Sequence, residues 1–213
     1  MLFTLLKIKI NKIILFFFPK ICRMCGNEGS EICNSCFDYF IPSGKTQIDG
    51  VDVFSCFEYN SKISQLLKDV KYNGKSELCS TMASYLIKFY KKEILASEFL
   101  IPISSSFISQ IKRKYNIPNL ICLRLKAKLK IKIFDVLKKN NSRSQVGLKK
   151  FERSQNATSF FDLKNINNCI KGKNIILIDD VFTTGSTIYF AIQKIKLLNP
   201  NKIIVLTFAR RDL

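Results

Sequence analysis

The sequence predicts an α/β protein with a doubly wound parallel sheet, preceded by a small module built on four cysteines. Short apolar runs rich in β-branched residues alternate with segments whose apolar residues recur at helical spacing. One such run, Ile175 to Ile178, is followed by two carboxylates, a loop of small hydroxyl residues and a helical pattern. Near the beginning of the chain, two Cys-x-x-Cys pairs lie close together.

The composition suits a folded domain with anionic partners. The chain has 213 residues, 47% of them hydrophobic, and a net charge of +19 from 35 basic and 16 acidic residues. Abundant Lys, Ile, Asn and Phe could reflect a general compositional bias, but the charge is uneven, because segment 107–153 is the most basic. The absence of histidine excludes imidazole bases, histidine metal ligands and Ser-His-Asp chemistry.

Residues 1–20 are apolar but interrupted by Lys7, Lys9 and Lys12. The longest uncharged stretch, Ile13 to Pro19, is too short to cross a bilayer, and the small residues that end a signal peptide are missing. We expect an amphipathic or core-covering helix, no stable membrane insertion and a cytoplasmic location, with weak membrane contact as the alternative.

The paired cysteines predict a structural metal site. Each Cys-x-x-Cys pair offers two thiolates, and four thiolates suit zinc first and iron second; the predicted ligands are Cys22, Cys25, Cys33 and Cys36. Thiols in a reducing compartment favour metal binding, whereas the alternative is a redox dithiol pair. The remaining cysteines are interpreted as small core residues: Cys56, Cys79, Cys122 and Cys169.

The predicted organisation is a leader with a metal module over residues 1–45 and an α/β domain over residues 46–213. The expected strands are Val51–Tyr59, Phe99–Ile103, Ile131–Leu137, Ala157–Phe161, Asn174–Asp179 and Lys202–Phe208. The expected helices are Ser61–Val70 and Ser76–Leu95, each capped by its first serine, Ser104–Lys130 broken at Pro118, and Ser186–Leu198. The polar segment 140–156 is interpreted as a mobile loop over a site.

The run from Asn174 to Thr187 predicts the site. Asp179 and Asp180 stand at the expected strand end, where open parallel sheets bind ligands. The loop and helix start that follow offer backbone N–H groups to a phosphate, through Thr183, Thr184, Gly185, Ser186 and Thr187. A sugar phosphate would give its hydroxyls to the acids and its ester to the loop. Separately, each part could be a solvated turn or a tight loop; their combination favours phosphate binding.

A second interpretation, a Walker A phosphate loop, is disfavoured by one residue. Asn73 to Ser76 ends like a Walker A loop, but the glycine required five residues before Gly74 is replaced by Asp69. That carboxylate would repel phosphates, so a turn followed by a helix cap is favoured over an ATPase.

The segment Ile176–Thr187 resembles the phosphoribosyl-diphosphate signature of type I phosphoribosyltransferases, and the whole chain resembles the ComF (competence protein) family within them. The likeness covers the four cysteines, Leu67 to Gly74, Ile101 to Ile103 and Arg143 to Phe160. The chain departs from the family pattern Arg-Gly-Phe-Asn-Gln at Arg113–Ile117. The resemblance implies a type I phosphoribosyltransferase-like sheet with a zinc-ribbon-like module.

The resemblance also implies phosphoribosyl diphosphate or a nucleotide as ligand, with Mg²⁺. Asp179 and Asp180 would be the catalytic carboxylates, contacting the ribose hydroxyls and the metal, and the hydroxyl loop would surround the 5′-phosphate. Basic residues of segment 140–156 are candidates for diphosphate or nucleic-acid contacts, or are a solvated surface: Arg143, Lys149, Lys150 and Arg153. Lys68 and Lys71 are further candidates for the diphosphate.

Two functions follow from the resemblance. One is a ligand-binding protein that serves DNA uptake in natural transformation, with single-stranded DNA and DNA-uptake proteins as partners. The other is an active phosphoribosyltransferase that makes a nucleotide from a free base. No residue pattern identifies a pocket for that base.

Overall fold

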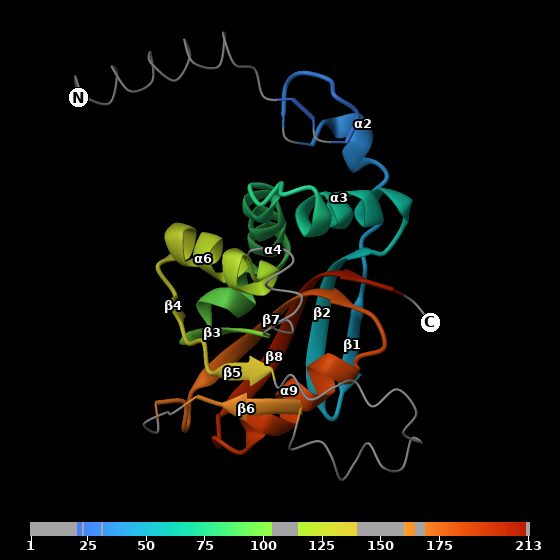
Figure 1. Ribbon diagram of the computed structural model, residues 1–213. Coiled ribbons are helices and arrows are strands. Elements are labelled where there is room, and N and C mark those ends of the chain that lie inside the picture. Colours follow the sequence, from blue (N-terminus) through green and yellow to red (C-terminus); the bar gives the residue numbers. More distant parts are fainter. Residues whose placement is uncertain are drawn as a thin grey trace, which may run out of the picture.

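The computed structural model describes residues 21–22, 24–30, 32–103, 115–139, 160–164 and 169–211, and the predictions for 1–20, 104–114 and 140–159 lie outside them. A six-stranded sheet has the order β1-β2-β8-β7-β3-β4 (Figure 1). Neighbours pair in parallel from β2 to β4, and β1 is antiparallel to β2. The strands are β1 (Lys45–Ile48), β2 (Val51–Glu58), β3 (Phe99–Pro102), β4 (Lys132–Ile133), β7 (Asn174–Phe182) and β8 (Lys202–Arg210).

Helices cover both faces of this sheet, as the doubly wound prediction requires. One face carries α3 (Ser61–Tyr72), α4 (Leu78–Leu95) and α6 (Ile117–Leu129). The other carries α9 (Ser186–Lys196) and the antiparallel pair of β5 (Leu137–Lys139) with β6 (Phe161–Leu163) (Figure 1). The short α2 (Asn34–Phe37) belongs to the cysteine module. The fold is therefore a mixed α/β fold around a mostly parallel sheet.

The central strand β7 is buried on both faces. Ile176 and Ile178 pack with the helices of the α3 face, and Ile175 and Leu177 pack with α9. Successive side chains of a strand point to opposite faces, so this division follows directly from the apolar run.

Two predicted helix starts were wrong. The side chain of Asn60, not Ser61, caps α3, because Asn60 is extended and its Oδ1 accepts a hydrogen bond from the N–H of Ile63 at 3.0 Å. Helix α4 begins at Leu78 rather than Ser76. Pro118 lies in the first turn of α6, where the N–H it lacks would have no partner within the helix, and the part of the expected helix before Tyr115 lies outside the described residues.

The small strands also differ from the predictions. The expected strand Ile131–Leu137 is divided into β4 and the start of β5, and the strand expected at 157–161 begins at Phe161. Strand β1 was missed, although Asp49-Gly50 between apolar residues is a strong hairpin signal. Cys56, Cys79 and Cys122 are buried as predicted, whereas Cys169 is exposed and is not a core residue.

The boundary predicted at residue 45 stays a prediction. Residues before it contact the sheet, since the N–H of Ser43 donates to the carbonyl of Cys56. In the part of the chain that the structure describes, every helix is too short or too polar to serve as a membrane span.

Candidate functional site

The acidic doublet lies within β7 rather than after it. We expected the strand to end at Asp179, but the pairing with β8 continues through Val181 and Phe182. Val181 and Phe182 are residue types that extend a strand readily, and they pair with Ala209 and Arg210. The doublet therefore occupies the sixth and seventh of the nine positions of β7.

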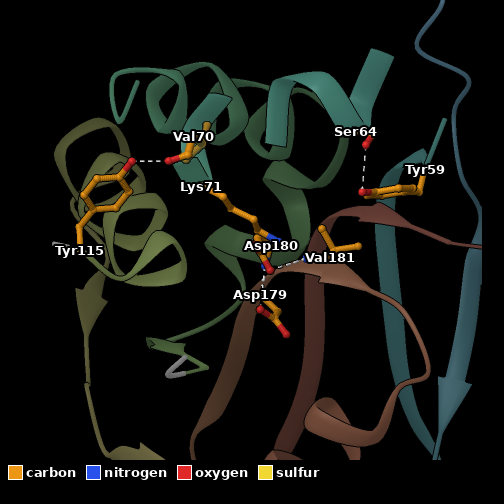
Figure 2. Close-up of polar contacts among 8 residues, drawn as sticks. All are labelled: Tyr59, Ser64, Val70, Lys71, Tyr115, Asp179, Asp180 and Val181. Atoms are coloured by element: carbon orange, nitrogen blue, oxygen red, sulfur yellow. Dashed lines mark hydrogen bonds and ion pairs between the residues drawn. The ribbon is translucent and has the colours of Figure 1, made fainter. Parts of the chain in front are cut away.

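Because side chains alternate along a strand, the two carboxylates of the doublet lie on opposite faces of the sheet. Figure 2 shows Asp180 directed toward α3 and Asp179 directed away from it. The N–H of Asp180 donates to Asp179 Oδ1 at 2.8 Å, and the N–H of Val181 donates to Asp180 Oδ1 at 2.9 Å. Each carboxylate is thus fixed by the backbone N–H of the next residue.

Lys71, in the last turn of α3, is the ion-pair partner of Asp180. Its Nζ lies 2.7 Å from Asp180 Oδ2, and the side chains are only 22% and 15% exposed (Figure 2). The hydroxyl of Tyr115 donates to the carbonyl of Val70, the residue before Lys71. The structure thus separates the two lysine candidates of α3, because Lys68 is exposed and Lys71 reaches the doublet.

The environment of Asp179 disfavours its charged form. The side chain is half-buried, and loss of solvent raises the pKa of its carboxyl well above the ordinary value; the nearby negative charge of Asp180 raises it further. Burial also lowers the pKa of Lys139 in β5, and the charge of Asp179 opposes that shift. Lys139 packs on Phe160, with its Nζ 4.5 Å from the ring centroid. Sequence reasoning missed Lys139, because it ends the short strand β5, whose partner β6 is distant in sequence, and this pairing has no local signal.

The hydroxyl loop connects β7 to α9, in the order strand, loop and helix that the sequence predicts. Gly185 is the N-cap of α9 and has a φ of 74°. This left-handed backbone conformation favours glycine, and a Cβ there would lie 2.9 Å from Ile48 Cδ1 and 3.1 Å from the ring of Phe182, so these side chains would have to shift. Thr184 Oγ1 and Ser186 Oγ lie 3.1 Å apart, and the first N–H groups of a helix have no partners within it. This arrangement can accept an anion.

Hollows of about 320 to 380 Å³ occur at the opposite edge of the sheet. They are lined by residues at the amino ends of the parallel strands, such as Phe99, Asn174 and Lys202. That edge lacks the doublet and the hydroxyl loop, so the chemistry favours the carboxyl edge.

The four predicted metal ligands come together. The sulfur atoms of Cys22, Cys25, Cys33 and Cys36 all lie within 4.8 Å of one another. A tetrahedral zinc site with Zn–S bonds of about 2.3 Å places its sulfurs about 3.8 Å apart, so the group can bind a metal such as zinc.

The backbone around the cysteine group also fits a metal thiolate. Burial opposes ionisation of Cys22, yet N–H groups of Cys33, Met24 and Cys25 lower its pKa to about 6. The N–H of Gly26, which has a φ of 81°, donates to the carbonyl of Cys22 at 2.8 Å and closes the first turn. Two of the cysteines are buried, so the group is part of the fold.

The predicted basic contacts Arg143, Lys149, Lys150 and Arg153 lie outside the described residues, and their placement at the site stays a prediction. Among the described residues, the basic side chains brought toward the doublet include Lys71 and Lys139.

Comparison with curated proteins shows the family. The chain is 30% identical to competence protein ComFC of Bacillus subtilis (strain 168) over 180 residues, which cover 80% of this chain and 69% of the relative. It is 27% identical to competence protein F of Haemophilus influenzae over 199 residues, covering 87% and 84%. The chain therefore belongs to the ComF family of competence proteins. A scan against protein-family models gave no match.

Solved structures with similar folds include phosphoribosyltransferases. Orotate phosphoribosyltransferase from Aeropyrum pernix has a TM-score of 0.42 and 14% identity, over 78% of this chain and 73% of that one. Purine phosphoribosyltransferase from Pyrococcus horikoshii Ot3 has a TM-score of 0.38 and 14% identity, over 66% and 75%.

Proposed function

We propose that this ComF-family chain is a phosphoribosyltransferase-like protein that binds phosphoribosyl diphosphate or a nucleotide, with Mg²⁺, and handles single-stranded DNA in the cytoplasm during DNA uptake. The observation that carries the proposal is the continuous β7–loop–α9 segment, which puts a carboxylate doublet directly before a helix start capped by Gly185. Names of the curated relatives support the connection with competence.

The proposed ligand contacts come from two parts of the β7–loop–α9 segment: the loop and helix start for the phosphate, and the doublet for the ribose. Backbone N–H groups and hydroxyls of Thr183 to Thr187 bind the 5′-phosphate, since a helix start favours negative charge. Carboxylate oxygens of Asp179 and Asp180 accept hydrogen bonds from ribose hydroxyls. They are also suitable oxygen ligands for Mg²⁺, which would neutralise phosphate charge when bound.

The cysteine module is proposed to hold structural zinc. Four protein thiolates fill a tetrahedral coordination shell and leave no open position for a substrate. Elemental analysis tests this, with one zinc per chain expected; iron in its place, or no metal with intact free thiols, would contradict it.

Calorimetric titration with phosphoribosyl diphosphate, with and without Mg²⁺, tests the ligand. We expect one site per chain and tighter binding with Mg²⁺. Ribose 5-phosphate should bind more weakly to the same site, because it keeps the ester and the hydroxyls but lacks the diphosphate. No heat from either compound would overturn the proposed ligand.

Single-stranded DNA binding is supported by the net charge of +19 and by the basic residues of segment 107–153. Retention of a single-stranded oligonucleotide should fall steeply with salt. Exchange of Arg143, Lys149, Lys150 and Arg153 for Gln should reduce retention. Exchange of four exposed lysines outside segment 107–153 serves as the control: Lys92, Lys171, Lys173 and Lys202. Negligible retention at both low and high salt would remove this part of the proposal.

The second candidate is an active phosphoribosyltransferase. The same doublet and phosphate loop favour it, because carboxylates stabilise the positive charge that develops on ribose when diphosphate leaves. Release of diphosphate with one member of a panel of free bases would support turnover, and no release across the panel would count against it. Exchange of both aspartates for Asn should abolish turnover but leave DNA retention intact.

A further inference from the structure

Lys71 brings a positive charge to the edge of the sheet where the proposed ligand binds. Its Nζ lies 2.7 Å from Asp180 Oδ2, and both side chains are mostly buried. An ammonium group has three N–H donors, and a single carboxylate oxygen occupies one of them. Among the described residues, Asp180 is the recorded partner of this ammonium group, so its other donors can bind a second anion at the same place.

The backbone on both sides of Lys71 is held in position. Before it, the carbonyl of Val70 accepts a hydrogen bond from the Tyr115 hydroxyl. The carboxylate of Asp69 accepts from Asn73 Nδ2 at 2.7 Å and from Lys75 Nζ at 2.8 Å, which ties the end of α3 to the following turn. A lysine fixed in this way loses little conformational freedom when it binds a ligand.

Charge makes the position of Lys71 significant. A ligand that carries a diphosphate brings several negative charges, and the carboxylate of Asp180 would repel them. Lys71 offsets that carboxylate and can contact the diphosphate oxygens at the same time. Lys68, one turn earlier on α3, is exposed and has the same charge. A substitution of Lys68 therefore distinguishes the loss of a local contact from a general electrostatic effect.

We propose that Lys71 is a ligand-binding residue of this site, whose ammonium group contacts the diphosphate of phosphoribosyl diphosphate while Asp180 holds it in place. The inference rests on the proposed function. A purely structural role, in which the ion pair only joins α3 to β7, predicts that removal of Lys71 affects every ligand of the site equally.

The test compares two ligands and three variants by calorimetry without Mg²⁺. Lys71→Met removes the cation, Lys68→Met is the matched control on the same helix, and Tyr115→Phe removes the hydroxyl that fixes Val70. We expect Lys71→Met to weaken binding of phosphoribosyl diphosphate by about 10- to 100-fold, the range for a lost hydrogen bond to a charged group. The affinity of Lys71→Met for ribose 5-phosphate should stay close to that of wild type. Tyr115→Phe should also lose affinity for phosphoribosyl diphosphate more than for ribose 5-phosphate, but by a smaller factor than Lys71→Met.

Each other outcome contradicts a distinct claim. If Lys71→Met binds phosphoribosyl diphosphate as wild type does, or loses both ligands equally, Lys71 is not a diphosphate contact. An equal loss in Lys68→Met would mean a general charge effect. If Lys71→Met fails to fold, Tyr115→Phe decides: the same ratio of affinities for the two ligands as in wild type would overturn the inference. If wild type binds neither ligand, the proposed function itself fails.

Discussion

The ring of Phe37, in the cysteine module, stacks on Tyr85 of α4 with centroids 5.3 Å apart and planes at 3°. Phe57 of β2 packs edge-on against both rings. The side chain of Lys88 lies over the ring of Phe37, with its Nζ 5.1 Å from the ring centroid. The module is therefore packed against the core of the α/β domain, and the proposed metal site and the sheet should share their stability.

This packing predicts that metal loss destabilises the chain. Cys22→Ser should lower the thermal midpoint, because one ligand is lost and α2 is no longer anchored; a loss of about 2 kcal/mol corresponds to about 4 to 8 °C in a domain of this size. Differential scanning calorimetry measures the midpoint. Cys169→Ser, which changes an exposed cysteine outside the module, is the control. Equal midpoints for Cys22→Ser and wild type would contradict the shared stability.

Gly185→Ala should disturb the hydroxyl loop, the proposed phosphate site. The added Cβ would meet Ile48 Cδ1 at 2.9 Å in a backbone conformation that alanine rarely adopts. We expect a loss of about 1 to 2 kcal/mol in the free energy of unfolding, measured by urea titration, together with weaker ligand binding. Gly44→Ala is the matched control, since its Cβ would meet no atom within 4 Å. Unchanged stability and binding in Gly185→Ala would show that the loop does not need this conformation.

The raised pKa of Asp179 predicts a dependence of stability on pH. Between the ordinary aspartate pKa of about 3.9 and the raised value, the folded state holds a proton that the unfolded state has lost. The free energy of unfolding therefore decreases as pH rises through that interval. Asp179→Asn should remove this decrease, which urea titrations of the ligand-free protein at several pH values would measure. The same slope in both proteins would contradict the shift.

The corrected cap of α3 gives a paired test. Asn60→Ala removes the side chain that accepts from the N–H of Ile63 and should cost about 1 kcal/mol of unfolding free energy. Ser61→Ala, at the residue predicted from the sequence, should have little effect, because Ser61 is exposed on the first turn. Chemical denaturation measures both. A larger loss in Ser61→Ala would restore the original prediction.

The sequence predicted the fold well in segments where the pattern of residue types fits a single kind of structure. The apolar run Ile175 to Ile178, the helical spacing after Ser186 and the four cysteines led to β7, α9 and the clustered sulfurs. Cap positions were less predictable, because Asn60 and Ser61 are both good caps and the backbone conformation decides between them.

The site was harder to predict because it depends on contacts between distant residues. The doublet and the hydroxyl loop are contiguous in sequence, but the division of the doublet between two faces requires β7 to continue to Phe182. The partnership of Lys71 with Asp180 joins residues more than a hundred positions apart. Neither relationship has a signal in the spacing of residues.

A crystal structure of the chain with phosphoribosyl diphosphate bound tests the central claim most directly. The proposal predicts the 5′-phosphate at the start of α9, within about 3 Å of backbone N–H groups between Thr183 and Thr187, and ribose hydroxyls toward the doublet. A ligand bound elsewhere, for example in the hollows at the amino ends of the strands, with this loop free of phosphate, would contradict it.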